Sequence, residues 1–109
     1  MAEVLVEFTE PVAGENGRTY TARVCSNQMP SGQWQGWIEF VPTDGGEPIR
    51  SARETTQPNR EDTVYWATGL TPVYLEGSLR RALDPIVRPV ARDIAPPAFD
   101  DPAPPTLVR

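Results

Sequence analysis

The stretch from residue 34 to residue 52 decides the fold, and it reads WQGWIEFVPTDGGEPIRSA. Its first half alternates between two sets of side chains, with Trp34, Ile38 and Phe40 on one side of an extended chain, which is typical of a strand. The following Asp44-Gly45 pair predicts a two-residue hairpin turn whose central residues need positive φ. The strand pairs that this turn sets are Phe40 with Ile49, Ile38 with Ser51, Glu39 with Arg50, and Trp37 with Ala52.

Two further strands precede this hairpin, over residues 3–12 and 19–26, and both alternate in the same way. The apolar pattern sets how they pair. A two-residue loop would place Tyr20 and Val24 opposite the polar side of the first strand, so a three-residue loop over residues 15–17 is favoured. That loop pairs Val12 with Tyr20 and Phe8 with Val24.

The segment 63–68 allows two interpretations. It is rich in β-branched and aromatic residues, and we favour a fifth strand on that ground. Asn59, followed by Arg60, Glu61 and Asp62, also has the form of a helix start, so a helix is the alternative.

The last regular element is a helix that begins after Thr71 and ends at Asp84-Pro85. Thr71 is a suitable N-cap, and Pro72 suits the first helical position. Gly77 in the middle of the helix indicates either close packing against the sheet or no special role. One face of the helix is apolar and carries Leu75, Leu79, Ala82 and Leu83.

The C-terminal segment is rich in proline, with seven among the 25 residues from 85 to 109. Such a segment does not form a helix or a central strand. Its apolar residues lead us to expect that residues 85–95 pack on the domain and that residues 96–109 form a loose tail. The sequence therefore predicts one α+β domain over residues 1–95. We expect an antiparallel meander of four to five strands, either a twisted sheet or a partly closed barrel, with one C-terminal helix packed on it.

The composition excludes much of the usual chemistry of active sites. The chain has 109 residues with no histidine, no lysine and one cysteine, Cys25. A Ser-His or Cys-His nucleophile cannot be assembled, and the usual zinc sites lack their ligands, so we expect no metal and no cofactor. We interpret Cys25 as a small buried apolar residue, with a reactive thiol as the alternative.

Charge and cysteine usage indicate where the protein works. A formal net charge of −5 disfavours nucleic acid as a partner. The acidic N-terminus does not resemble a signal peptide, and no apolar run approaches the roughly 20 residues of a membrane span. With a single cysteine, which cannot close an internal disulfide, these features predict a cytoplasmic protein. The exclusive use of arginine indicates a GC-rich bacterial genome.

Carboxylates are the remaining candidates for catalysis. Glu54, Glu61, Asp62 and Glu76 lie around the end of the predicted fourth strand and the start of the helix, near Arg53, Arg60, Tyr65 and Tyr74. A pocket of Glu, Arg and Tyr transfers protons if burial raises a carboxyl pKa toward neutrality. Acid-base pairs at such places are more often surface salt bridges and caps, which favours a non-catalytic interpretation.

Binding signals are stronger than catalytic ones. Trp34 and Trp37 fall on opposite faces of the predicted sheet, so Trp37 is either shielded by the helix or tail, or exposed as a contact hot spot. A basic run along the C-terminal part is either a solvated helix end or a docking surface for an acidic partner. It consists of Arg80, Arg81, Arg88 and Arg92.

We therefore predict a non-catalytic protein-binding or accessory module, whose partner is another protein or a second copy of this chain. The alternatives are a small-ligand-binding domain or an enzyme that uses a Glu/Arg/Tyr pocket. An enclosed pocket lined by the aromatic and acidic candidates favours these alternatives, whereas a flat apolar sheet face or an exposed edge favours protein contact. The candidate binding residues are Trp37, Arg53, Glu54, Tyr65, Trp66, Tyr74 and Glu76.

Overall fold

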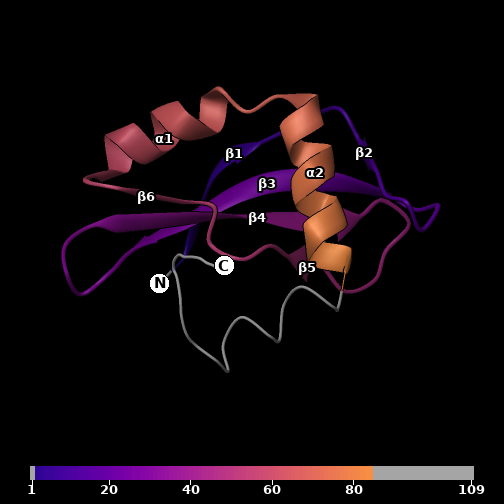
Figure 1. Ribbon diagram of the computed structural model, residues 1–109, viewed down its shortest axis with the longest axis horizontal. Coiled ribbons are helices and arrows are strands. Elements are labelled where there is room, and N and C mark those ends of the chain that lie inside the picture. The colour runs from indigo at the N-terminus through magenta and orange to yellow at the C-terminus, as the bar shows by residue number, and fades with distance from the viewer. Residues whose placement is uncertain (1, 85–109) are drawn as a thin grey trace, which may run out of the picture.

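The computed structural model describes residues 2–84, which form an open antiparallel sheet and two helices (Figure 1). The two long strands β3 and β4 lie at its centre, β1 and β2 pair with β3, and β5 and β6 pair with β4. The predicted α+β class is confirmed, and the sheet is not closed into a barrel. The elements are β1 (Glu3–Glu7), β2 (Val12–Ala13), β3 (Thr19–Gln28), β4 (Trp34–Pro42), β5 (Ile49–Arg50), β6 (Thr55–Gln57), α1 (Arg60–Thr68) and α2 (Pro72–Leu83).

The predicted register of the second hairpin is confirmed. Phe40 pairs with Ile49, and Glu39 pairs with Arg50. The backbone N–H of Ser51 also donates to the carbonyl of Ile38 at 2.8 Å. The alternation of apolar residues was therefore sufficient to set which side of β4 faces the core.

The turn of that hairpin differs from the prediction. Residues 43–48 connect the two strands, and the N–H of Gly45 donates to the carbonyl of Pro42 at 3.2 Å, so the predicted two-residue turn is wrong. Positive φ occurs at Gly45 (94°) and Gly46 (120°). The N–H of Thr43 donates to the carbonyl of Thr19 at 3.0 Å, so Thr43 still lies beside β3 after β4 has ended.

The loop of the first hairpin is confirmed. Val12 pairs with Tyr20, and the N–H of Gly14 donates to the carbonyl of Arg18 at 2.8 Å, which leaves residues 15–17 as a three-residue loop. Gly17 closes this loop with a φ of 85°, a conformation that glycine adopts without steric cost.

The predicted pair of Phe8 with Val24 is wrong, because Val24 pairs with Val6 instead. The N–H of Phe8 donates to the carbonyl of Ala22 at 2.9 Å. Residues 9–11 lie between β1 and β2 and add length that the sequence prediction counted as paired strand. Pro11 in this connection has no N–H to offer to the ladder, which favours the interruption.

The predicted fifth strand over residues 63–68 is wrong, because these residues belong to α1. The side chain of Asn59 accepts a hydrogen bond from the N–H of Asp62 at 2.8 Å and caps the helix. The hydroxyl of Thr63 donates to the carbonyl of Asn59 at 2.9 Å. These local bonds outweigh the strand preference of the β-branched residues. The strand beside β4 is instead β6, where Thr55 pairs with Gly36.

The predicted C-terminal helix is confirmed as α2. The hydroxyl of Thr71 accepts a hydrogen bond from the N–H of Tyr74 at 3.2 Å, as expected of an N-cap. Three residues of the predicted apolar face are buried, and Leu83 packs partly against the core. The apolar face of α2, together with Ala67 of α1, packs on five core side chains of β3 and β4. They are Tyr20, Ala22, Val24, Ile38 and Phe40.

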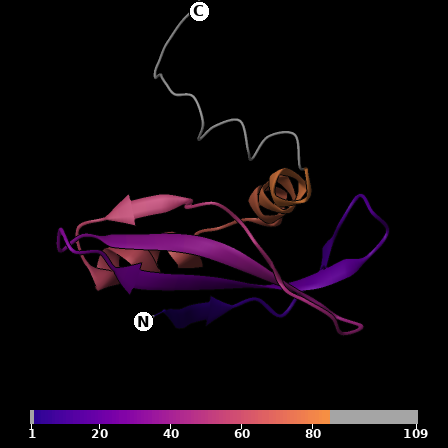
Figure 2. The same ribbon diagram turned by 90° about the horizontal axis from the view of Figure 1, so that it is seen from below.

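Both helices therefore pack on one face of the sheet. Figure 2 looks onto the opposite face, with α1 visible behind the strands and no helix in front of them. Neither helix in residues 2–84 is long and apolar enough to cross a membrane. The expected packing of residues 85–95, the loose tail from residue 96, and Arg88 and Arg92 of the basic run lie outside the described residues.

The position of Gly77 allows a stability prediction. A Cβ built there would lie 3.5 Å from Nη1 of Arg81, in ordinary contact, so the sheet does not require a glycine at this point. Gly77→Ala is expected to raise the free energy of unfolding by about 0.5–1 kcal/mol, because alanine loses less backbone entropy in a helix. Urea unfolding measures this change in the free energy of unfolding, and the m-value is expected to stay the same.

Gly36→Ala is the matched control, since a Cβ there would lie 3.1 Å from Cγ2 of Thr55 and 3.4 Å from the ring of Trp66. This variant is expected to lower stability. A loss of stability in Gly77→Ala equal to that in Gly36→Ala would show that α2 is also tightly packed at residue 77.

Candidate functional site

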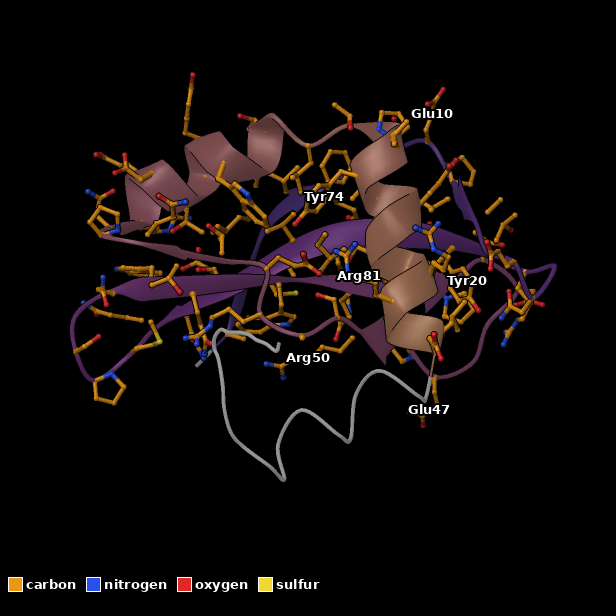
Figure 3. The ribbon with its side chains drawn as sticks, viewed as in Figure 1. Glu10, Tyr20, Glu47, Arg50, Tyr74 and Arg81 are labelled. Atoms are coloured by element: carbon orange, nitrogen blue, oxygen red, sulfur yellow. The ribbon has the colours of Figure 1, made fainter. Side chains whose placement is uncertain are left out.

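Glu54 lies in the segment before β6, and its side chain is only 9% exposed. Its carboxylate accepts hydrogen bonds from the hydroxyl of Tyr74 at 2.5 Å and from the hydroxyl of Ser78 at 2.8 Å. The guanidinium of Arg81 donates to the same carboxylate at 3.2 Å. The three donors are spaced i, i+4 and i+7 and therefore lie on one side of α2, as Figure 3 shows for Tyr74 and Arg81. We call Glu54, Tyr74, Ser78 and Arg81 the Glu54 cluster.

Aromatic and cationic contacts surround the Glu54 cluster. Trp66 of α1 meets the Tyr74 ring edge to face, with ring centroids 6.5 Å apart and an interplanar angle of 89°. The guanidinium of Arg81 lies 5.9 Å from the centroid of the Tyr74 ring. A buried carboxylate is costly unless it is paired and hydrogen-bonded, and here both conditions are met. The arrangement thus fastens α2 to the segment that leads into β6.

The protonation of Tyr74 fits this fastening role. Burial and the hydrogen bond to the Glu54 carboxylate raise the pKa of Tyr74 to about 12. The phenol therefore keeps its proton at neutral pH and donates a hydrogen bond to the Glu54 carboxylate. A carboxylate already occupied by three donors is poorly placed to take a proton from a substrate.

A pH dependence of stability follows from the pKa of Tyr74. The folded chain keeps the phenol proton where the unfolded chain loses it, near the usual value of 10. This contribution is therefore complete below about pH 10 and is lost as the pH rises toward about 12. Unfolding free energies of the wild type and Tyr74→Phe, measured from neutral to alkaline pH, are expected to converge over this range.

Glu54→Gln provides the control for this prediction. Without the neighbouring negative charge, the pKa of Tyr74 is expected to fall toward its usual value, as followed by the ultraviolet absorbance of tyrosinate. If Tyr74 ionises at the same pH with and without the Glu54 carboxylate, the two groups do not interact as described.

The structure brings together three of the seven predicted binding residues, namely Glu54, Trp66 and Tyr74. Arg53 is exposed and turns away, with its Nη1 3.4 Å from Sδ of Met29, so Arg81 rather than Arg53 is the basic partner of Glu54. Tyr65 is 83% exposed on α1. Glu76 is exposed on the opposite side of α2 from the Glu54 cluster.

The other acidic candidates serve α1. Glu61 and Asp62 lie in its first turn, where negative charge suits the helix dipole. Arg60 pairs with Glu3 of β1 at 2.6 Å rather than with Glu54. These residues are the caps and surface pairs that the sequence analysis favoured over catalysis.

Trp37 precedes the core residue Ile38 in β4, and neighbouring residues of a strand point to opposite faces, so the Trp37 side chain lies on the face away from the helices. It is only 3% exposed. The exposed hot-spot alternative is therefore wrong. Trp37 pairs with Cys25 of β3, and the guanidinium of Arg50 lies 4.1 Å from the centroid of its ring. Cys25 is also buried, and burial raises the pKa of its thiol, which confirms the apolar interpretation of this residue.

A groove runs along the side of α2 that faces away from the Glu54 cluster. At the start of α2 it forms a pocket of about 350 Å³ with Phe8, Val12, Leu70 and Leu75 among the residues that line it. Two further pockets follow along the helix, of about 90 Å³ and about 380 Å³, and adjacent pockets share lining residues. We call these three adjacent pockets together the α2 groove. Its walls are residues 8–16 on one side, and Pro72, Leu75, Glu76, Arg80, Leu83 and Asp84 on the other.

The rim of the α2 groove is charged. Glu10 stands beside the start of α2 (Figure 3), Glu76 lines the first and second pockets, and Glu15 lines the second and third. None of these three carboxylates has an ion pair or a side-chain hydrogen bond within residues 2–84. The guanidinium of Arg80 lines the second and third pockets beside these carboxylates. The groove thus combines apolar side chains in its first and last pockets with three carboxylates and one guanidinium, an excess of negative charge.

Sequence reasoning missed parts of both features. Arg81 was named only as part of the basic run and Ser78 was not named, although both share the helical side of Tyr74 and could have been assigned to the same site. Glu10 and Glu15 carried no local signal, since only the packing of residues 8–16 beside α2 gives them a common surface. No protein-family model, curated protein or solved structure matches this chain.

Proposed function

We propose that this chain is a non-catalytic protein-binding module that holds a segment of a partner protein in the α2 groove. The observation that carries the proposal is the groove itself. It is open, it has apolar side chains in its first and last pockets, and its three carboxylates have no ion pair within residues 2–84, although the guanidinium of Arg80 lies among them. Grooves with an apolar floor and a few polar groups are a common means of recognising peptide segments. A location in the cytoplasm of a bacterium belongs to the same proposal and rests on the sequence.

The state of the Glu54 cluster supports this function over the enzyme and small-ligand alternatives. Glu54 already accepts from three side chains of α2. Of the seven candidate binding residues, Glu76 is the one that lines the α2 groove. The groove therefore does not combine Glu54 with Tyr65, Trp66 and Tyr74 in an enclosed pocket.

The edge of the sheet formed by β1 is a weaker candidate for protein contact. β1 is an edge strand, but its register shifts between Val4 and Val6. It also begins and ends with acidic residues, Glu3 and Glu7. Irregularity and charge on an edge strand hinder pairing with another strand, so the groove is the better surface.

A matched pair of variants tests the proposal. Thr9 is exposed at the groove and Thr56 is exposed on β6, so Thr9→Arg and Thr56→Arg make the same change inside and outside the groove. We expect proteins captured by the wild-type chain from cells that express it to be retained by Thr56→Arg and reduced at least about tenfold by Thr9→Arg. Equal capture by both variants, with both folded, would place partner binding elsewhere.

A further inference from the structure

We propose that residues 86–92 of this chain dock in the α2 groove, so that the chain's own segment and a partner segment compete for one site. The competition with a partner segment rests on the proposed function. The docking itself rests on position, length and charge, which are independent of any partner.

The position of the segment fits because the groove ends where the described chain ends. α2 finishes at Leu83, and Asp84 follows as its C-cap. Both residues line the last pocket of the groove. The next residues of the chain therefore begin at the mouth of the groove and need only turn back along α2 to enter it.

The length of the segment also fits. α2 has 12 residues and is about 18 Å long at about 1.5 Å per residue. An extended chain advances about 3.3 Å per residue, so about six residues match the helix. Residues 86–92 are seven residues joined by six such steps, about 20 Å at about 3.3 Å per step, and Pro85 and Pro89 favour an extended backbone.

The chemistry of the segment matches the groove in order. Ile86 and Val87 come first and suit the pocket beside Leu83. Arg88 then reaches the middle of the groove, where the two carboxylates of Glu15 and Glu76 outnumber the single guanidinium of Arg80. Val90 follows for the apolar floor of the first pocket, and Arg92 reaches its far end. The carboxylates that receive the two guanidinium groups are Glu15 and Glu76 for Arg88, and Glu10 for Arg92. Arginine is well suited to such pairs because its planar group binds carboxylates through two hydrogen bonds.

A spin label on the full-length chain tests the docking. Ala91→Cys accepts a nitroxide, while the native Cys25 is buried and stays unlabelled. We expect strong paramagnetic broadening of the backbone amides of residues 9–10, 12–15 and 76–80. We expect little broadening at residues 29 and 31–33, at the tip of the β3–β4 hairpin. Broadening at the groove no greater than at that tip would overturn the proposal.

Charge exchange makes the test specific. Glu10→Arg with Glu76→Arg is expected to abolish the groove broadening, and adding Arg88→Glu with Arg92→Glu is expected to restore it. Glu61→Arg changes an exposed carboxylate on α1 and is expected to leave the broadening unchanged. Loss of broadening without restoration by the exchanged charges would contradict the assigned pairs.

A mixed sample distinguishes docking within one chain from docking of one copy's segment in the groove of another copy. The unlabelled, isotope-enriched chain is combined with spin-labelled chain of natural isotope content. Broadening at the groove in this mixture would show that a second copy supplies the segment and would overturn docking within the chain. If Thr9→Arg reduces partner capture but the spin label causes no broadening at the groove, the docking is rejected and the proposed function stands. If the label broadens the groove but Thr9→Arg and Thr56→Arg capture partners equally, the proposed function alone is rejected.

Discussion

Glu54→Ala is expected to lower the free energy of unfolding by about 2–4 kcal/mol. The side chain of Glu54 is 9% exposed, and its carboxylate is the shared acceptor for Tyr74, Ser78 and Arg81. Without this carboxylate, the hydroxyl groups of Tyr74 and Ser78 lose their acceptor, and each must be rehydrated or left unpaired. Urea unfolding of the full chain measures the loss.

Glu76→Ala is the matched control for this experiment. Glu76 is exposed on the other side of α2 and has no side-chain partner in residues 2–84. Its removal is expected to change stability by no more than about 0.5 kcal/mol, since an exposed ion pair such as the one proposed with Arg88 contributes little. Similar small losses for Glu54→Ala and Glu76→Ala would mean that the Glu54 cluster does not fasten α2.

Trp37→Ala is expected to lower the free energy of unfolding by about 3–5 kcal/mol. Trp37 is 3% exposed, and its loss removes a large apolar contact beside Cys25. It also removes the surface on which the guanidinium of Arg50 stacks. Thermal and urea unfolding of the variant measure this effect.

Tyr65→Ala is the control for Trp37→Ala, because it removes an aromatic side chain that is exposed rather than buried. Tyr65 is 83% exposed on α1, so its truncation is expected to cost about 0.5 kcal/mol or less. If Trp37→Ala were as stable as Tyr65→Ala and lost only partner capture, Trp37 would be a binding residue and its structural role would be refuted.

The elements that were predicted correctly carry local signals. The cap at Thr71, the proline after it and the apolar spacing of Leu75 and Leu79 define α2 within one stretch of chain. The register of β4 with β5 likewise follows from alternation on both strands. α1 also had a local signal in Asn59, but strand preference was given more weight than the cap.

The candidate site was predicted in part, because its geometry depends on contacts between distant elements. Glu54 and Tyr74 were placed in one group correctly, yet Arg53 was chosen as a partner in place of Arg81. Adjacent residues of an extended segment point to opposite sides, which is a reason to expect Arg53 and Glu54 to diverge. The contact of Arg50 with Trp37 was implied by the predicted register, since Arg50 faces the neighbour of Trp37 two positions along β4.

The α2 groove had no comparable signal. It forms where residues 8–16 pass beside α2, more than fifty residues later in the chain. Alternation and helical spacing describe the inward faces of these elements and say little about a surface that two of them form together.

Photo-crosslinking tests most directly whether the α2 groove is the partner site. A benzophenone amino acid is placed at Thr9 in the groove of one chain and at Thr56 on β6 of another, in cells that express the protein. We predict a discrete adduct with a partner protein from position 9 and none from position 56. Adducts of equal yield from both positions, or from position 56 alone, would contradict the assignment of the groove.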